Sequence, residues 1–106
     1  MRPLFRIRVT GLSMVPTLAP GEKVLCIGMF RRHLLRSGAV VVARAPISGQ
    51  ELVVKRVGRV FADGSFDVVG DNSVVSTDSR HFGSLAPASY EGRVLGVYAP
   101  RIRRLR

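Results

Sequence analysis

The chain has 106 residues, 46% of them apolar, which suits one domain over residues 1–106 with a single buried core and excludes global disorder. Its apolar runs are far shorter than the roughly 20 residues that span a bilayer, and arginines stand where a signal peptide needs apolar residues. The single cysteine, Cys26, excludes an internal disulfide framework, so we expect a soluble cytoplasmic domain.

The chain is strongly basic, with a formal net charge of +10. Such a balance is typical of proteins that bind nucleic acid, acidic peptides or anionic lipid. Four arginines fall within residues 101–106, which we interpret as a basic tail or an edge strand. No recognition-helix, zinc-finger or stacking motif accompanies them, so we expect no nucleic acid partner. A solvated basic face and a peripheral membrane contact both remain open.

Residues 4–10 alternate between apolar and polar side chains, and this period of two predicts a half-exposed strand that ends at Gly11. The same criteria predict strands at residues 23–30, 39–44, 51–61, 66–69 and 92–99. Asp63-Gly64 predicts the hairpin turn between the last two strands before the long loop. Many short strands separated by glycine and proline indicate an all-β fold, a small barrel or two packed sheets, with one or two short helical turns.

The connections between these strands differ in what they suggest. Residues 13–18 are too short for a regular helix and contain Pro16, which a helix tolerates only in its first turn. Residues 31–38 form a polar connection with room for one helical turn, and residues 87–91 predict another turn. Residues 70–83 read as a polar loop, and a structureless loop of that length in a compact domain suggests function.

Lys55 is one of only two lysines among the 17 basic residues. Alternation along the strand puts it on the same face as Val53 and Val57, and a lysine desolvated on such a face has a lowered pKa. Unlike arginine, a lysine can then be neutral and act as a base. The alternative is that Lys55 lies on the solvated face and Arg56 on the covered one, because lysine is rarely fully buried.

Ser13 is the matching candidate for a nucleophile, because a serine hydroxyl becomes nucleophilic when a neighbouring base takes its proton. Gly11 permits a close backbone approach, and the peptide N–H groups around Gly11 and Ser13 can face a developing oxyanion. Alternatively, Ser13 only caps a short turn that ends at Leu18.

The loop over residues 70–83 supplies candidate supporting groups. Ser76 can hydrogen-bond the Lys55 amine and aim it, while Asp78 and Arg80 can pair and hold the loop. The alternative is a turn-rich loop held by its own Asp and Ser side chains. Its acidic residues lack EF-hand spacing, and His33 and His81 lack partner ligands, so we expect no metal and no cofactor.

Three segments, taken together, resemble the motif boxes of type I signal peptidases. They are residues 13–18 followed by Gly21-Glu22-Lys23-Val24, then Val54-Lys55-Arg56-Val57, then Gly70-Asp71-Asn72 and Ser76-Thr77-Asp78-Ser79-Arg80 up to Gly83. The resemblance implies a β-fold serine endopeptidase that acts on a protein precursor, with Ser13 as nucleophile and Lys55 as general base. It also implies that Ser76 orients Lys55 and that Asp78 and Arg80 brace the loop.

Other features refine this expectation. We take Met14, Pro16 and Leu18 as candidates for the substrate pocket, with an apolar lip around Met14 and Leu18. Some signal peptidases carry a serine where this chain has Gly11, so backbone N–H groups would serve alone. The chain also lacks their membrane anchor and their large insertions. Among short, anchorless members, it looks most like the actinobacterial maturation proteases of nickel-type superoxide dismutase, which remove an N-terminal propeptide.

Two other functions stay in view. A self-cleaving repressor-type peptidase uses a similar dyad, but only twelve residues precede Ser13, without a helix-turn-helix segment or an Ala-Gly cut site. A non-enzymatic basic β-domain that binds nucleic acid or an acidic partner would account for the charge, but it leaves the combination of Ser13, Lys55 and Ser76 unexplained.

Overall fold

The computed structural model describes residues 3–28, 35–47 and 49–105, which form one seven-stranded antiparallel sheet. The strands are β1 (Leu4–Arg8), β2 (Lys23–Gly28), β3 (Val40–Ala45), β4 (Glu51–Val60), β5 (Phe66–Val69), β6 (Tyr90–Ala99) and β7 (Arg103–Arg104). Their order across the sheet is β1-β2-β6-β3-β4-β5, and β7 pairs with β6. The mainly β fold predicted from the sequence is confirmed.

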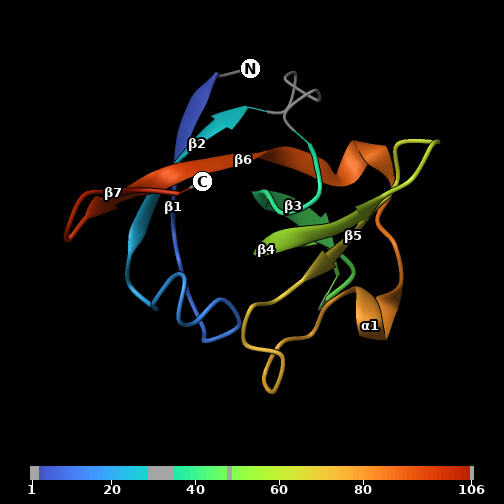
Figure 1. The fold of residues 1–106 in the computed structure, drawn as a ribbon, viewed down its shortest axis with the longest axis horizontal. Coiled ribbons are helices and arrows are strands. Elements are labelled where there is room, and N and C mark those ends of the chain that lie inside the picture. The colour runs from blue at the N-terminus through green and yellow to red at the C-terminus, as the bar shows by residue number, and fades with distance from the viewer. Residues whose placement is uncertain (1–2, 29–34, 48, 106) are drawn as a thin grey trace.

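The sheet is curved, so that its two halves lie on different sides of the molecule. Figure 1 shows β1, β2 and β7 on one side, β3, β4 and β5 on the other, and β6 running across between them. The pairing register shifts within β2–β6, β3–β6 and β4–β5, and such bulges bend strands and increase their twist. The long strand β6 therefore belongs to both halves and connects them.

The core consists of two clusters on opposite faces of β3. The first contains Val9, Met14, Leu18, Val24, Cys26, Val40, Val42, Val94 and Val97. The second contains Ala39, Val41, Ala43, Ala45, Val57, Phe66, Val68, Leu85 and Tyr90. Because β3 lies between β6 and β4 with both faces covered, it is apolar at nearly every position instead of alternating.

The long polar loop over residues 70–83 is not structureless as predicted, because it contains the short helix α1 (Ser79–Phe82). The helix begins after Asp78, whose side chain accepts a hydrogen bond from the Arg80 backbone N–H as an N-cap. The predicted turn near Pro87 is present as a 3₁₀ helix, Pro87–Ser89. Within the described residues, no helix is long and apolar enough to cross a membrane.

Other expectations have mixed outcomes. Residues 13–18 form turns and no regular helix, as predicted, and the Val15–Pro16 peptide bond is cis. The basic C-terminal segment is in part an edge strand, since β7 pairs with β6. The end of the second predicted strand, His33 and most of the predicted connection over residues 31–38 fall on residues 29–34, outside the described part of the chain.

The predicted apolar lip is wrong, because Met14 and Leu18 are buried in the first cluster with exposures of 1% and 0%. The turn over residues 13–18 folds inward across the sheet and supplies core side chains. Leu12, in contrast, is 54% exposed.

We therefore expect Leu18→Ala to lower the free energy of unfolding by about 2–5 kcal/mol, because it removes buried apolar atoms and leaves a cavity. Leu12→Ala is the matched control and should change it by less than about 0.5 kcal/mol. Urea denaturation of both variants measures the difference, and equal effects would contradict the assignment of Leu18 to the core.

Candidate active site

Lys55 is a buried lysine in the middle of β4, with only 4% of its surface exposed. It pairs across the sheet with Val41 and shares a face with Val57, and both valines belong to the second core cluster. The neighbouring Arg56 points to the other face, where 30% of its side chain is exposed. The alternative in which Lys55 is solvated and Arg56 covered is therefore excluded.

The surroundings of Lys55 favour its neutral form. Burial lowers the pKa of the amine below its usual value, because the ammonium loses hydration. The negative charge of Asp78 acts in the opposite direction, but the positive charge of Arg80 lowers the pKa again. Because Asp78 and Arg80 are paired with each other, Lys55 faces a pair with little net charge.

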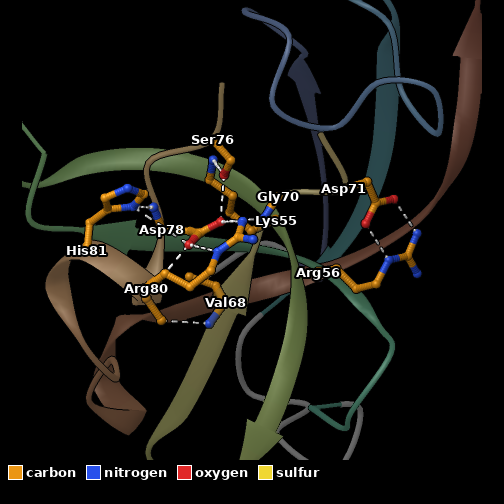
Figure 2. A network of polar contacts seen from close by, with 10 residues as sticks. Lys55, Arg56, Val68, Gly70, Asp71, Ser76, Asp78, Arg80 and His81 are labelled. Atoms are coloured by element: carbon orange, nitrogen blue, oxygen red, sulfur yellow. Dashed lines mark hydrogen bonds and ion pairs between the residues drawn. The ribbon is translucent and has the colours of Figure 1, made fainter. Parts of the chain in front are cut away.

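A chain of buried hydrogen bonds runs from Lys55 into the loop (Figure 2). The Lys55 Nζ donates to Ser76 Oγ at 3.0 Å, and Ser76 Oγ donates to Asp78 Oδ2 at 2.7 Å. Asp78 also accepts from the Gly70 backbone N–H at 2.8 Å and from Arg80 Nε and Nη2 at 2.9 and 2.5 Å. Burial alone would raise the pKa of Asp78, but these hydrogen bonds outweigh it and hold the pKa well below its usual range.

Gly70 lies where the lysine and serine segments meet, and it has no room for a side chain. A Cβ at this position would lie 2.2 Å from Ser76 Oγ and 2.7 Å from the Ser13 carbonyl oxygen. The bare backbone of Gly70 is therefore what lets the turn carrying Ser13 approach the Ser76 side chain. Its glycine identity reflects this close contact, since no positive φ is required of it.

The backbone of Ser13 is held by the start of the same loop. Asn72 N–H donates to the Ser13 carbonyl at 2.8 Å, and Asn72 Nδ2 donates to the Leu12 carbonyl at 3.2 Å. Among the described residues, the Ser13 hydroxyl makes no side-chain hydrogen bond, so it does not cap the turn that follows. Ser13 is half-buried, and its hydroxyl is left for another partner.

Sequence reasoning missed a second network, which ties the turn to β4. Arg56 Nε and Nη2 donate to the two carboxylate oxygens of Asp71 at 2.8 and 2.7 Å (Figure 2). Thr17 Oγ1 also donates to Asp71. The Arg56 guanidinium is the largest influence that lowers the pKa of Asp71. The sequence signal for this pair was position alone. Arg56 directly follows the candidate Lys55, and Asp71 directly follows Gly70 at the start of the candidate loop.

The C-terminal strand provides a third tie. Arg103 on β7 donates from Nη1 to Glu22 Oε2 at 2.5 Å and from Nη2 to the Thr17 carbonyl at 2.7 Å. Hydrogen bonds from Arg103 are the main cause that lowers the pKa of Glu22 to about 2. Part of the predicted basic tail is thus built into the fold next to the turn.

A cleft of about 460 Å³ opens beside these groups, and both Ser13 and Lys55 line it. One wall is residues 7–14, the other is Ile47 with residues 51–55, and Val75 and Thr77 of the loop complete it. Among the predicted pocket residues, Met14 lines the cleft, but Leu18 lies in the core and Pro16 is exposed outside the lining. The prediction that Leu18 and Pro16 line the pocket is therefore wrong.

Of the remaining predicted site residues, Gly11 lies at the cleft with a φ of 74°, a conformation that favours glycine. Ser76, Asp78 and Arg80 lie together behind Lys55, as described above. The described residues contain no group of three or more His, Cys, Asp or Glu side chains that could hold a metal ion. The reactive groups of this cleft are thus the buried Lys55 amine and the Ser13 hydroxyl.

Comparison with known proteins supports the interpretation of this chain as a protease. No family model matches the chain. It is 32% identical over 110 residues to the mitochondrial ATP-independent inner membrane protease subunit 1a of Arabidopsis thaliana, a match that covers 82% of this chain and 66% of the relative. The chain thus spans just under two thirds of that relative's length. The match supports a signal-peptidase-like protease family for this chain.

We expect Gly70→Ala to lower the free energy of unfolding by about 1–3 kcal/mol, because its methyl group would overlap Ser76 Oγ and the Ser13 carbonyl. Gly58→Ala is the matched control, since a Cβ there lies 3.5 Å from the nearest atom, an ordinary contact. Thermal denaturation of the two variants compares them. An equally mild effect of both would show that Ser13 does not approach Ser76 closely at this glycine.

The lowered pKa of Lys55 predicts a specific pH dependence of stability. In the unfolded chain the lysine has its usual pKa of 10.5, so between the folded pKa and 10.5 the unfolded state binds more protons. In that window the free energy of unfolding rises with pH. Relative to Lys55→Met, the wild type should gain stability as pH rises toward 10.5 and then level off. Urea denaturation over this range measures it, and a constant difference would contradict a desolvated amine.

Proposed function

We propose that the chain is a serine endopeptidase in which Ser13 and Lys55 form a catalytic dyad that removes an N-terminal leader from a protein precursor. The observation that carries the proposal is a lysine 4% exposed, bonded to Ser76 and lining the same cleft as Ser13. A buried lysine that contacts no carboxylate directly lowers the stability of the fold. Its location in the same cleft as the Ser13 hydroxyl is a reason to assign the lysine a chemical role.

The proposed reaction begins with neutral Lys55 taking the proton from the Ser13 hydroxyl as the oxygen attacks the substrate carbonyl. The resulting lysine ammonium then gives its proton to the leaving amine, and an acyl-enzyme remains on Ser13. Lys55, neutral again, takes a proton from a water molecule that attacks the ester. It then gives this proton to the departing Ser13 oxygen as the acid is released, which restores the hydroxyl and the neutral amine. Ser76 keeps the amine aimed at the cleft through the 3.0 Å hydrogen bond.

Backbone N–H groups at the turn would stabilise the oxyanion. Gly11 and Ser13 both line the cleft, and the positive φ of Gly11 turns the chain sharply just before the nucleophile. The hydrogen bonds from Asn72 to the Ser13 and Leu12 carbonyls hold this turn, so its N–H groups need little rearrangement.

The walls of the cleft suit an extended peptide. β1 is the terminal strand of the sheet, and β4 pairs with β5 only from Arg56 onward, so residues 51–54 have one free edge. Both stretches line the cleft, and a substrate segment can add to such edges through main-chain hydrogen bonds. Small side chains before the cut follow from the resemblance to signal peptidases, and the propeptide of a nickel-type superoxide dismutase is the first substrate to test.

We expect Ser13→Ala and Lys55→Met each to lower the cleavage rate of a precursor by about 1,000-fold or more, because each removes one member of the dyad. Lys55→Arg should fail as well, since arginine stays protonated. Incubation with candidate precursors, followed by mass spectrometry of the products, measures cleavage and reports any self-cleavage of the enzyme. Wild-type activity should rise with pH through a pKa below 10.5.

The matched controls are Ser73→Ala, an exposed serine of the same loop, and Lys23→Met, the other lysine of the chain. Both lie outside the lining of the cleft and should leave the rate within about twofold of the wild type, as surface substitutions usually do. Full cleavage by Ser13→Ala or Lys55→Met would overturn the dyad, whatever the substrate.

A further inference from the structure

The cleft contains a carboxylate that the proposed dyad does not use. Glu51 is the only acidic side chain among the described residues that line the cleft. It begins β4 and, by the alternation of a strand, lies on the same face as Val53 and Lys55. Its cross-strand partner Ala45 belongs to the second core cluster, so the Glu51 side chain stands on that side of the sheet.

Glu51 is exposed, and within residues 3–28, 35–47 and 49–105 no lysine or arginine forms an ion pair with it. Four of the other six acidic residues do pair with an arginine. The neighbouring lining residues Ile47, Leu52 and Val53 are aliphatic. Burial is the main cause that lowers the pKa of Lys55, and the negative charge of Glu51 is among the influences that oppose it. The carboxylate is thus close enough to act on charges inside the cleft.

Arg8 is the other charged residue of the lining besides Lys55, and its side chain does not neutralise Glu51. Arg8 pairs with Lys23 across β1 and β2, so the two side chains point to the same side of the sheet. The neighbouring Val9 is buried in the first core cluster, so Arg8 points to the opposite side. A segment bound in the cleft therefore meets one negative charge that has no cation of its own.

The two walls of the cleft have the same direction. Four antiparallel pairings separate β1 from β4, namely β1–β2, β2–β6, β6–β3 and β3–β4, so both strands run the same way. Both run toward the reactive groups, β1 leading on to Ser13 and β4 passing from Glu51 to Lys55. Glu51 precedes Lys55 by four residues, a distance of about 13 Å along a strand that rises about 3.3 Å per residue.

The reaction decides which part of the substrate the walls have to hold. In the proposed mechanism the segment before the cut stays bonded to Ser13 as the acyl-enzyme, while the segment after the cut departs. The walls must therefore bind the segment before the cut. When this segment is extended and its last residue lies at Ser13 and Lys55, about its fifth residue before the cut lies beside Glu51.

We propose that Glu51 is a specificity-determining residue that selects leaders with a lysine or arginine about five residues before the cut. The inference rests on the proposed endopeptidase function and adds to it the class of leader. The substrate cation contacts the Glu51 carboxylate, and its aliphatic stem packs on Ile47 and Val53. These apolar neighbours reduce screening by water, so the ion pair is stronger than one on an open surface.

The net charge of the protein has the opposite effect on a basic leader, but it acts without regard to position. A formal charge of +10 repels every basic peptide at long range, wherever the lysine stands in its sequence. Attraction by Glu51 requires the cation to lie within contact distance of one carboxylate. The position of the lysine in a peptide therefore separates the two effects.

The test uses peptides of about twelve residues that differ only in where a single lysine stands. One carries the lysine five residues before the intended cut, one carries it three residues further from the cut, and one carries it after the cut. Fluorescence anisotropy measures their binding to the whole chain with Ser13→Ala, which does not depend on cleavage. We expect the first peptide to bind about fivefold more tightly than the other two. Mass spectrometry of products from the wild type should show the same order of cleavage.

Variants of Glu51 in the same Ser13→Ala background assign the preference to its charge. Glu51→Gln should reduce the preference for the first peptide to less than about 1.5-fold, and Glu51→Lys should instead favour a peptide with glutamate at that position about fivefold. Glu91→Gln is the matched control. It makes the same chemical change at a partly exposed glutamate outside the cleft lining, so the preference for the first peptide should persist.

Equal binding of the three lysine peptides to the Ser13→Ala protein would overturn the proposal. A preference that persists in Glu51→Gln would assign it to another group, and tightest binding of the peptide with lysine after the cut would place the wrong segment in the cleft. Either result would refute the role of Glu51. Cleavage by the wild type without any positional preference would refute this role and leave the dyad intact, whereas positional binding without cleavage would do the reverse.

Discussion

The buried hydrogen-bond chain from Lys55 through Ser76 to Asp78 is the interaction around which the site is arranged. A lysine amine with 4% exposure needs a partner, because a buried polar group without a hydrogen bond is costly. A carboxylate in direct contact would have kept the amine charged. A serine hydroxyl placed between the two provides the hydrogen bond, while Arg80 neutralises the carboxylate from its other side.

Three ties converge on the turn that carries Ser13, and they come from three different parts of the chain. Asn72 holds the Ser13 and Leu12 carbonyls, the Arg56–Asp71 pair holds Thr17, and Arg103 holds Glu22 together with the Thr17 carbonyl. A turn without regular secondary structure would otherwise be mobile. Burial of Met14 and Leu18 anchors it from below, so the position of Ser13 is set by the core as well as by polar contacts.

The distribution of charge follows from how few acidic residues the chain has. Four of the seven pair with an arginine, at Glu22, Asp71, Asp78 and Glu91, and three of these pairs lie beside the turn or the loop of the site. Most arginines in the described part of the chain are thus left without a carboxylate partner. Those on β1 and β7 project from the side of the sheet opposite the first core cluster, and this segregation gives the molecule a basic face.

Local patterns in the sequence were sufficient for the strands and for the face on which Lys55 lies. Period-two alternation depends only on the geometry of one strand, so Val53, Lys55 and Val57 could be assigned together without knowledge of their neighbours. The same reasoning failed for Met14 and Leu18. Whether an apolar side chain of an irregular turn faces the core or the solvent depends on what the turn packs against. Helix α1 was missed because four residues carry almost no periodicity, although Asp78 signalled its start.

The sequence by itself determined the mainly β architecture and the candidate residues Ser13, Lys55 and Ser76, because side-chain chemistry and strand periodicity are local properties. Only the tertiary structure decided that Ser13 and Lys55 share one cleft and that Ser76 bonds the lysine. It also decided that Gly70 must be bare for these segments to approach, and that Arg56 and Arg103 hold the turn from other strands. Contacts between residues tens of positions apart arise from the strand order β1-β2-β6-β3-β4-β5 and its bulges, and no local pattern encodes that order.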